Sequence, residues 1–259
     1  MFWLLAIGLS GDASAQEAPP IVNGSTTSDY EPVGLLAICD NNYWYGWFCS
    51  GTLVHNRWAI TAAHCIEAAE EYEQQGYNTC FAIGDDATKN NGRGIDTFAT
   101  VRNMYMHPSY SGANSGAHDV GVLELSKSLS NVEKMPVNSD TVRSSWEGDA
   151  ITFVGWGITS DNREDSGVKR TVDVALNAYD GSVLYTYERG KNICSGDSGG
   201  AALRPDGGKM ELVGVVSFGY DITGGRPLCD TPNAAGGSMR ADRYYSWFEN
   251  YIPYMEDVD

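Results

Sequence analysis

Short apolar segments separated by turn residues recur along this chain of 259 residues and constrain its fold more than any other feature. The segments are rich in β-branched and aromatic residues, and Gly, Asn, Asp or Ser residues lie between them, which is the pattern of strands joined by tight turns. Many such strands predict an all-β architecture. The clearest examples are residues 51–54, 150–154, 171–176 and 212–218.

Helical periodicity emerges only at the C-terminal end of the sequence. Apolar residues recur there at a spacing of three or four, and a proline follows them, so we predict a helix over residues 242–252. The residues on its apolar face are Tyr244, Trp247, Phe248, Tyr251 and Ile252, followed by Pro253. The chain length suits one compact domain, or two small barrels that share an interface.

Residues 194–200 read CSGDSGG and place Ser198 between an acid and two glycines in a tight turn. Glycine adopts backbone angles that other residues avoid, so main-chain N–H groups in such a turn can converge on one point. A hydroxyl beside convergent N–H groups is what acyl transfer requires, namely a nucleophile and a binding site for the oxyanion. Ser198 is therefore a candidate nucleophile.

Two further motifs precede this turn. Residues 61–65 read TAAHC, carry His64 and follow the strand-like residues 58–60; residues 118–125 read HDVGVLEL and place Asp119 at the head of an apolar run. The chain order His, Asp, Ser is that of chymotrypsin-like enzymes and differs from that of α/β-hydrolases and subtilisins. On these three motifs, the chain from Ile21 to about Ile252 resembles the chymotrypsin/trypsin family of serine endopeptidases.

This resemblance implies two perpendicular six-stranded antiparallel β-barrels and a C-terminal α-helix packed on the second barrel. We expect a protease domain over residues 21–259, with the first barrel at about 21–129 and the second at about 132–240. Pro136 and its polar neighbours would link the barrels. The active site would lie in the cleft between them.

The resemblance also implies a role for each residue of the three motifs. Ser198 would attack the substrate, His64 would take the Ser198 proton, and Asp119 would orient His64 and fix its tautomer. The backbone N–H groups of Gly196 and Ser198 would form the oxyanion hole. The remaining histidines are expected at turns, at the surface or facing away from the site: His55, His107 and His118.

The family's mature N-terminus matches Ile21. Cleavage before this residue would free an ammonium that pairs with the buried Asp197 and orders the oxyanion turn. Here Pro20 stands where a trypsin-like activator needs a basic residue, so the sequence does not identify the activating protease. Residues 16–20 are interpreted as a short propeptide; alternatively, the two prolines are a rigid lead-in.

The first fifteen residues resemble a secretory signal. They contain an apolar run over residues 2–9 and an A-x-A cleavage site at residues 13–15, but no basic n-region. The run is too short to span a bilayer, and no second apolar stretch could serve as a membrane anchor. We therefore expect a secreted protein, either extracellular or, in a bacterium, periplasmic.

The resemblance places the base of the specificity pocket at Asn192. Trypsin-like enzymes carry an aspartate there to pair with Arg or Lys, and a neutral amide cannot repay the desolvation of a buried cation. Cleavage after large uncharged residues is therefore expected, unless Asp221 or Asp230 points into the pocket. The expected walls are Ser217, Phe218, Gly219 and Gly236.

Six cysteines in an exported chain indicate disulfides. The resemblance implies the pairs Cys49–Cys65, which would hold the histidine loop, and Cys194–Cys229, beside the pocket. Cys39 and Cys80 are then left to pair with each other. We expect no metal and no other cofactor, because there is no CxxC pair and the adjacent Asp85 and Asp86 do not make a calcium cage.

A formal net charge of −17 argues against nucleic acid as a partner. We expect a monomer that takes polypeptide substrates and binds protein protease inhibitors. The leading hypothesis is a secreted serine endopeptidase acting through an acyl-enzyme. The alternatives are a catalytically silent protease-like binding protein, an unactivated zymogen and, less favoured, an esterase or acyltransferase that uses the same triad.

Overall fold

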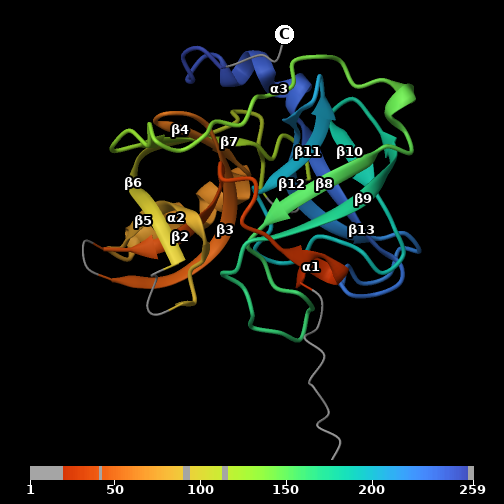
Figure 1. Ribbon diagram of the computed structural model, residues 1–259, viewed down its shortest axis with the longest axis horizontal. Helices are drawn as coiled ribbons and strands as arrows, with labels where there is room; N and C mark the ends of the chain where they lie inside the picture. Colours follow the sequence, from red (N-terminus) through yellow and green to blue (C-terminus); the bar gives the residue numbers. More distant parts are fainter. Residues whose placement is uncertain (1–19, 41–42, 90–93, 113–115, 256–259) are drawn as a thin grey trace, which may run out of the picture.

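The computed structural model describes residues 20–40, 43–89, 94–112 and 116–255. They form two β-barrels with a helix at the C-terminal end, and Figure 1 shows the barrels side by side, the first in orange and yellow and the second in green and blue. This confirms the expected chymotrypsin-like fold. None of the helices in these ranges is long and apolar enough to cross a membrane.

The first barrel closes in the strand order β2-β3-β4-β7-β6-β5, and its strands pair antiparallel. Its strands are β2 (Val33–Cys39), β3 (Trp44–His55), β4 (Trp58–Thr61), β5 (Asn78–Asp86), β6 (Gly94–Met106) and β7 (Gly121–Leu125).

The second barrel has the order β9-β10-β13-β12-β11-β8 and closes through an antiparallel pairing of β9 with β8. Its strands are β8 (Ala150–Gly155), β9 (Arg170–Tyr179), β10 (Val183–Thr186), β11 (Ala201–Asp206), β12 (Lys209–Asp221) and β13 (Ala234–Arg240). The remaining elements are α1 (Pro20–Asn23), β1 (Ser25–Thr26), α2 (Ala63–Gln74), the 3₁₀ turn η3 (Ser144–Trp146) and α3 (Ala241–Phe248).

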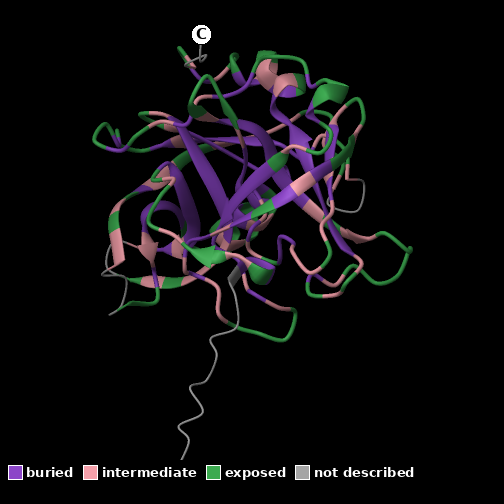
Figure 2. Cartoon of the chain, turned by 45° about the vertical axis from the view of Figure 1, so that its right-hand side comes forward, coloured by how far each residue is buried: buried purple, intermediate pink, exposed green. Residues whose placement is uncertain are grey.

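Burial explains why these segments form strands. In β9 buried Val172, Val174 and Leu176 alternate with more exposed residues, which is the period of a strand with one face in the core. In β12 a continuous run over residues 211–217 is buried, so this strand is covered on both faces. Figure 2 shows the buried segments gathered inside the two barrels. The four strand segments predicted from sequence lie within β3, β8, β9 and β12, so these predictions are confirmed.

The start of the domain lies against the second barrel, and not in the first barrel as expected. Strand β1 pairs with β9 through Ser25 opposite Thr171. The side chain of Ile21 has no exposed surface and belongs to the apolar cluster inside the second barrel, together with Phe153 and Val213. Burial of this isoleucine accounts for the position of the segment.

The predicted C-terminal helix ends four residues early. Helix α3 stops at Phe248, and the N–H groups of Asn250 and Tyr251 donate to carbonyls three residues back, as in a tight turn. Ile252 is nevertheless buried, so the apolar face continues beyond the helix.

Helix α2 was missed by the sequence reading. Its sequence, AHCIEAAEEYEQ, consists largely of good helix formers, but its buried face is narrow. That face contains small side chains and one isoleucine, so the apolar periodicity is weak: Ala63, Cys65, Ile66 and Ala69.

Candidate active site

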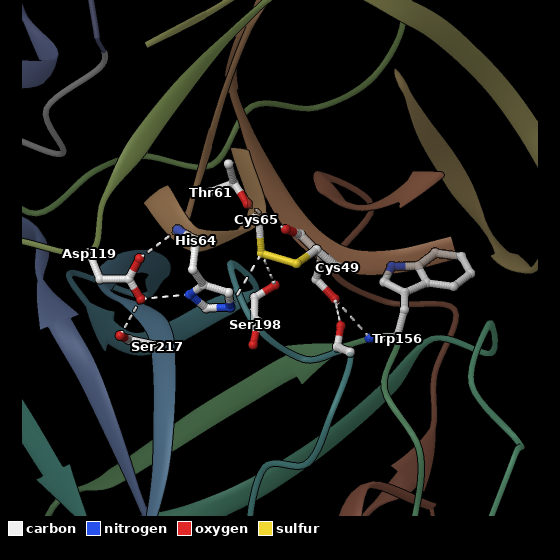
Figure 3. Close-up of a disulfide and its surroundings, with 10 residues drawn as sticks. Cys49, Thr61, His64, Cys65, Asp119, Trp156, Ser198 and Ser217 are labelled. Atoms are coloured by element: carbon white, nitrogen blue, oxygen red, sulfur yellow. Dashed lines mark hydrogen bonds and ion pairs between the residues drawn. A yellow bond between two sulfur atoms is a disulfide. The ribbon is translucent and has the colours of Figure 1, made fainter. Parts of the chain in front are cut away.

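Three segments from the two barrels bring the candidate residues together. His64 is the second residue of α2, directly after β4; Asp119 lies two residues before β7; and Ser198 lies in the turn that leads into β11. In Figure 3, His64 lies between Asp119 on one side and Ser198 on the other. The arrangement joins His64 and Asp119 of the first barrel to Ser198 of the second.

Asp119 holds His64 through both carboxylate oxygens. The backbone N–H of His64 donates to Oδ1 at 2.9 Å, and ring Nδ1 lies 2.7 Å from Oδ2. The hydroxyl of Ser217 donates to Oδ2 as well, at 2.5 Å. Burial raises the pKa of Asp119, but the hydrogen bond and charge of His64 and the Ser217 hydroxyl outweigh it, so the pKa lies below 3.8. Asp119 is therefore a carboxylate at neutral pH.

This pairing sets the state of the imidazole. The carboxylate accepts a hydrogen bond from Nδ1–H of His64, which leaves Nε2 of the neutral ring with a lone pair on the side of Ser198. Among the described residues, the Ser198 hydroxyl makes no hydrogen bond to Nε2. Such bonds are often long or badly aligned before substrate binds. The geometry is that of an oriented base beside a nucleophile.

The disulfide Cys49–Cys65 packs against the ring of His64 and restricts its movement. Sγ of Cys65 lies 3.7 Å from Nε2 of His64 and 3.5 Å from the backbone carbonyl oxygen of Ser198. The bond joins strand β3 to the first turn of α2, so the base cannot move away from β3.

Ser50, which no sequence motif identified, links the two barrels beneath the nucleophile. Its N–H donates to the Ser198 carbonyl at 2.8 Å, and its hydroxyl donates to the Gly196 carbonyl at 2.8 Å. The same hydroxyl accepts the Trp156 N–H at 3.1 Å. One buried serine thus positions the nucleophile turn against β3. The only signal in the sequence was its place next to Cys49.

In the described turn at residues 194–200, the N–H groups of Ser195, Gly196 and Ser198 make no hydrogen bond. Gly196 has a φ of +95°, and a methyl group there would lie 2.8 Å from the Cα of Gly157, so only glycine fits. Within the ranges described, neither the Gly196 N–H nor the Ser198 N–H donates a hydrogen bond, whereas Asp197, Gly199 and Gly200 all do. Gly196 and Ser198 are the two of these residues expected to form the oxyanion hole.

Asp197 points away from the nucleophile into the second barrel. It is 1% exposed, and its carboxylate accepts the N–H groups of Gly157 and Cys194, each at 2.8 Å. Burial raises the pKa of Asp197 to about 6, against these two hydrogen bonds and the charge of Arg170. Ile21 is buried in the same barrel but is still joined to Pro20, so its nitrogen is an amide without charge.

A cavity of about 250 Å³ opens beside Ser198. Three of the expected wall residues line it: Ser217, Phe218 and Gly219. The surface also includes Ile193, Val216, Pro227, Leu228 and the Cys194–Cys229 disulfide. These apolar groups share the cavity surface with Asp161, Ser195, Ser198 and Ser217.

The placement of Asn192 and Gly236 in this pocket needs correction, since neither lines the cavity. Asn192 is 3% exposed, and its amide donates to the Ala235 carbonyl at 3.5 Å. A methyl group at Gly236 would lie 3.2 Å from Cγ1 and Cδ1 of Ile193. The same methyl group would lie 3.3 Å from Oδ1 of Asn192, so both side chains pack on Gly236, but only Ile193 lines the cavity. The sequence reading had considered only the residue before it.

The acids near the pocket do not form its base. Asp221 is bound to its own loop through Thr223, and Asp230 accepts the Ser160 hydroxyl at 2.5 Å. Asp161 lines the cavity, which sequence reasoning missed, but its carboxylate accepts the backbone N–H of Cys229 at 2.7 Å.

All three expected disulfides are formed: Cys39–Cys80, Cys49–Cys65 and Cys194–Cys229. In the described ranges, two groups of residues have metal-ligand spacing, and each contains one of these disulfides, whose sulfurs are not thiolates. Asp85 pairs with the buried Lys169 and Asp86 with Lys89, so both carboxylates already contact a cation.

The other histidines lie outside this constellation. His107 and His118 stack with ring centroids 4.9 Å apart, and Nδ1 of His118 lies 3.2 Å from the hydroxyl of Tyr244 on α3. His55 accepts a long hydrogen bond from the backbone of Arg57. Only His64 contacts Asp119 among the described histidines.

Comparison with known proteins gives a consistent result. The family model described as Trypsin matches residues 21–247. The chain is 30% identical to Trypsin-1 of Salmo salar over 234 residues, which are 85% of this chain and 88% of that protein. It is 26% identical to a venom serine protease of Polistes dominula, over 79% of this chain and 76% of that one. It is 24% identical to Limulus clotting factor C of Carcinoscorpius rotundicauda over 95% of this chain, but spans only 27% of that longer protein.

Proposed function

Because this chain belongs to the trypsin family of serine peptidases, we propose that it is a secreted endopeptidase acting through Ser198, His64 and Asp119. The observation that carries the proposal is the clamp of Asp119 on His64, with Ser198 on the open side of the ring. A buried carboxylate, an oriented imidazole and a serine beside free N–H groups form a complete apparatus for acyl transfer.

The reaction proceeds in two halves. Nε2 of His64 takes the Ser198 proton while Oγ bonds to the carbonyl carbon, and the resulting oxyanion accepts the N–H groups of Gly196 and Ser198. His64 then returns the proton to the amine nitrogen, the C–N bond breaks and an acyl-enzyme remains. Water repeats the sequence: His64 takes its proton, its oxygen bonds to the carbon, and Ser198 leaves with the proton.

We further propose that the enzyme prefers substrates with an uncharged side chain immediately before the scissile bond. Among the described residues, the one carboxylate that lines the cavity, that of Asp161, already accepts the Cys229 N–H, and a buried cation without a partner would carry a large desolvation cost. Packing of Ile193 on Gly236 shortens the space, which favours aliphatic side chains of moderate size over the largest aromatic ones. A panel of chromogenic peptides tests this; dominant cleavage after Arg or Lys would refute it.

Secretion is proposed on the three disulfides and on the signal-like sequence of residues 1–15. Three disulfides are typical of proteins that fold in an oxidising compartment. The signal-like segment, residues 1–15, and most of the expected propeptide, residues 16–19, lie outside the described residues. Export is tested by finding which N-terminus the protein carries outside the expressing cell.

A silent zymogen or binding protein is the second candidate, favoured by one observation. Pro20 precedes Ile21, so a protease specific for basic residues would not release the ammonium that Asp197 is expected to bind. Intact mass of the secreted protein distinguishes the two, since a chain that starts at Ile21 is processed and one that starts at Gln16 is not.

Labelling with a fluorophosphonate tests the main proposal. The probe should attach to Ser198 in the chain that begins at Ile21, and Ser198→Ala should abolish both labelling and peptide hydrolysis. Ser246→Ala, an exposed serine of α3 far from the site, is the matched control and should change neither. Retained turnover in Ser198→Ala would exclude Ser198 as nucleophile.

A further inference from the structure

In the uncleaved chain, the buried carboxylate of Asp197 lacks the partner that the family would give it. Within the described residues, no cationic group lies within 4.0 Å of it, and it is held by the N–H groups of Gly157 and Cys194. A buried carboxylate with only neutral partners is costly to keep ionised. A positive charge close by would lower that cost.

Arg170, the first residue of β9, supplies such a charge. Its side chain is 5% exposed, and Nη1 donates to the Gly157 carbonyl at 2.8 Å and to the Val168 carbonyl at 3.3 Å. Gly157 in turn donates its N–H to Oδ1 of Asp197 at 2.8 Å. One residue therefore connects the guanidinium to the carboxylate, with a hydrogen bond on each side.

Gly157 packs so closely on Asp197 that a displacement of Gly157 would displace Asp197 as well. A methyl group at Gly157 would lie 2.7 Å from the backbone nitrogen of Asp197 and 2.8 Å from its Cγ. Arg170 thus fixes the peptide against which the oxyanion turn rests. A shift of Gly157 would move Asp197 and its neighbours Gly196 and Ser198.

Arg170 forms no direct ion pair with a described carboxylate. Among the described residues it makes no salt bridge within 4.0 Å, and its Nε is buried without a hydrogen-bond partner. Burial lowers the pKa of its guanidinium, while the charges of Asp165, Asp197 and Asp86 oppose this effect. An arginine remains charged in proteins despite such lowering. Its unsatisfied position argues for a role beyond local packing.

The segment that follows the expected cleavage point is already buried against the second barrel. Ile21 is fully buried while still attached to Pro20, its carbonyl accepts the Gly24 N–H at 2.7 Å, and Val22 forms a bridge to Asn192. Cleavage would therefore add an ammonium charge to a segment that is docked beforehand.

We propose that Arg170 is the counter-charge of Asp197 in the uncleaved chain, acting through Gly157 to hold the Gly196–Ser198 turn competent before any cut at Pro20–Ile21. The inference rests on the proposed function, since it assumes that Ser198 is the nucleophile. It also accounts for a proline at a junction where a basic residue would be needed for activation by a trypsin-like enzyme. Arg170 is a positioning residue, because it does not touch the substrate.

The test compares fluorophosphonate labelling rates of two forms of the full domain, each identified by intact mass. One form keeps Pro20; the other is cut before Ile21 at an introduced recognition sequence for a specific protease. In the uncleaved form, Arg170→Gln should slow labelling by about 100-fold, the cost of losing one oxyanion donor. Arg170→Lys, which keeps the positive charge, should retain most of the wild-type labelling rate in the uncleaved form. In the cleaved form, Arg170→Gln should have little effect, because the ammonium of Ile21 then pairs with Asp197.

Arg143→Gln, an exposed arginine of the same domain, is the control and should leave both forms unchanged. The inference is overturned if the uncleaved wild-type chain does not label while the cleaved chain does, an outcome that leaves the proposed function intact. It is also overturned if Arg170→Gln slows both forms equally and lowers the melting temperature, because the role is then structural only. If neither wild-type form labels, the proposed function itself fails.

Discussion

Ser217 and His64 donate to the same carboxylate oxygen of Asp119, at 2.5 Å and 2.7 Å. This shared acceptor connects the wall of the specificity cavity to the base, since Ser217 also lines the cavity. The hydroxyl supports the negative charge on Asp119 that the imidazolium needs during the reaction.

Ser217→Ala should therefore reduce kcat/KM by roughly tenfold, the usual cost of one hydrogen bond to a charged group. The loss should fall on kcat more than on KM, because the charge on His64 develops only during the reaction. Steady-state kinetics with a short peptide substrate measures this, with Ser246→Ala as the matched control. A change confined to KM would mean that Ser217 serves the cavity alone.

The position of Ile193 predicts an unusual result for the pocket. Ile193 lines the cavity and the buried Asn192 does not, so Asn192→Asp alone should not create cleavage after Arg or Lys. Asn192→Asp combined with Ile193→Ser should create it, because the smaller side chain opens the path. The ratio of kcat/KM for peptides with Arg or Leu immediately before the scissile bond measures this preference. Strong Arg cleavage by the single variant would show that Ile193 does not cover the base.

Spacing and local motifs could predict the fold and the three segments that meet in the candidate site, but not the shape of the pocket. TAAHC, the HDV segment and GDSGG are contiguous strings, and each holds its functional residue in a fixed local context. Two disulfide pairs followed from the resemblance that these strings carry, and the third by elimination. The side chains of Asn192 and Ile193 both pack beside Gly236, and which of them lines the cavity is decided by tertiary packing around β13.

Helix α2 and the contacts of Ser50 and Arg170 could not be predicted from the sequence either. Helix α2 buries only a narrow face of small residues, so the apolar period that reveals α3 is absent. The side chains of Ser50 and Arg170 donate to backbone carbonyls of distant segments, and a sequence does not show which backbone groups lie close together in the fold. Only the meeting of the two barrels brings these partners together.

The two disulfides of the first barrel predict separable effects. Replacing Cys39 and Cys80 with alanine opens a loop of 41 residues, and replacing Cys49 and Cys65 opens one of 16. The chain-entropy model gives about 4 and about 3 kcal/mol for these losses of stability. Only the second pair contacts His64, so only its removal should lower kcat per folded molecule. Denaturant unfolding together with active-site titration separates the two quantities. Equal losses of kcat in both variants would contradict the positioning role of Cys65.

Asp197 predicts how the stability of the uncleaved chain depends on pH. Its pKa is raised from 3.8 to about 6, so between these values the folded chain binds a proton that the unfolded chain has already released. Stability should therefore fall as pH rises from about 4 to about 6, by roughly 3 kcal/mol for this group, and then level off. Asp197→Asn removes the titration, so the difference in unfolding free energy between the variant and the wild type should change in favour of the variant over this range. In the chain cut before Ile21, the ammonium offsets the burial of Asp197, and the same comparison should show a smaller or reversed slope. A pH-independent difference in the uncleaved chain would mean that Asp197 does not titrate between these values.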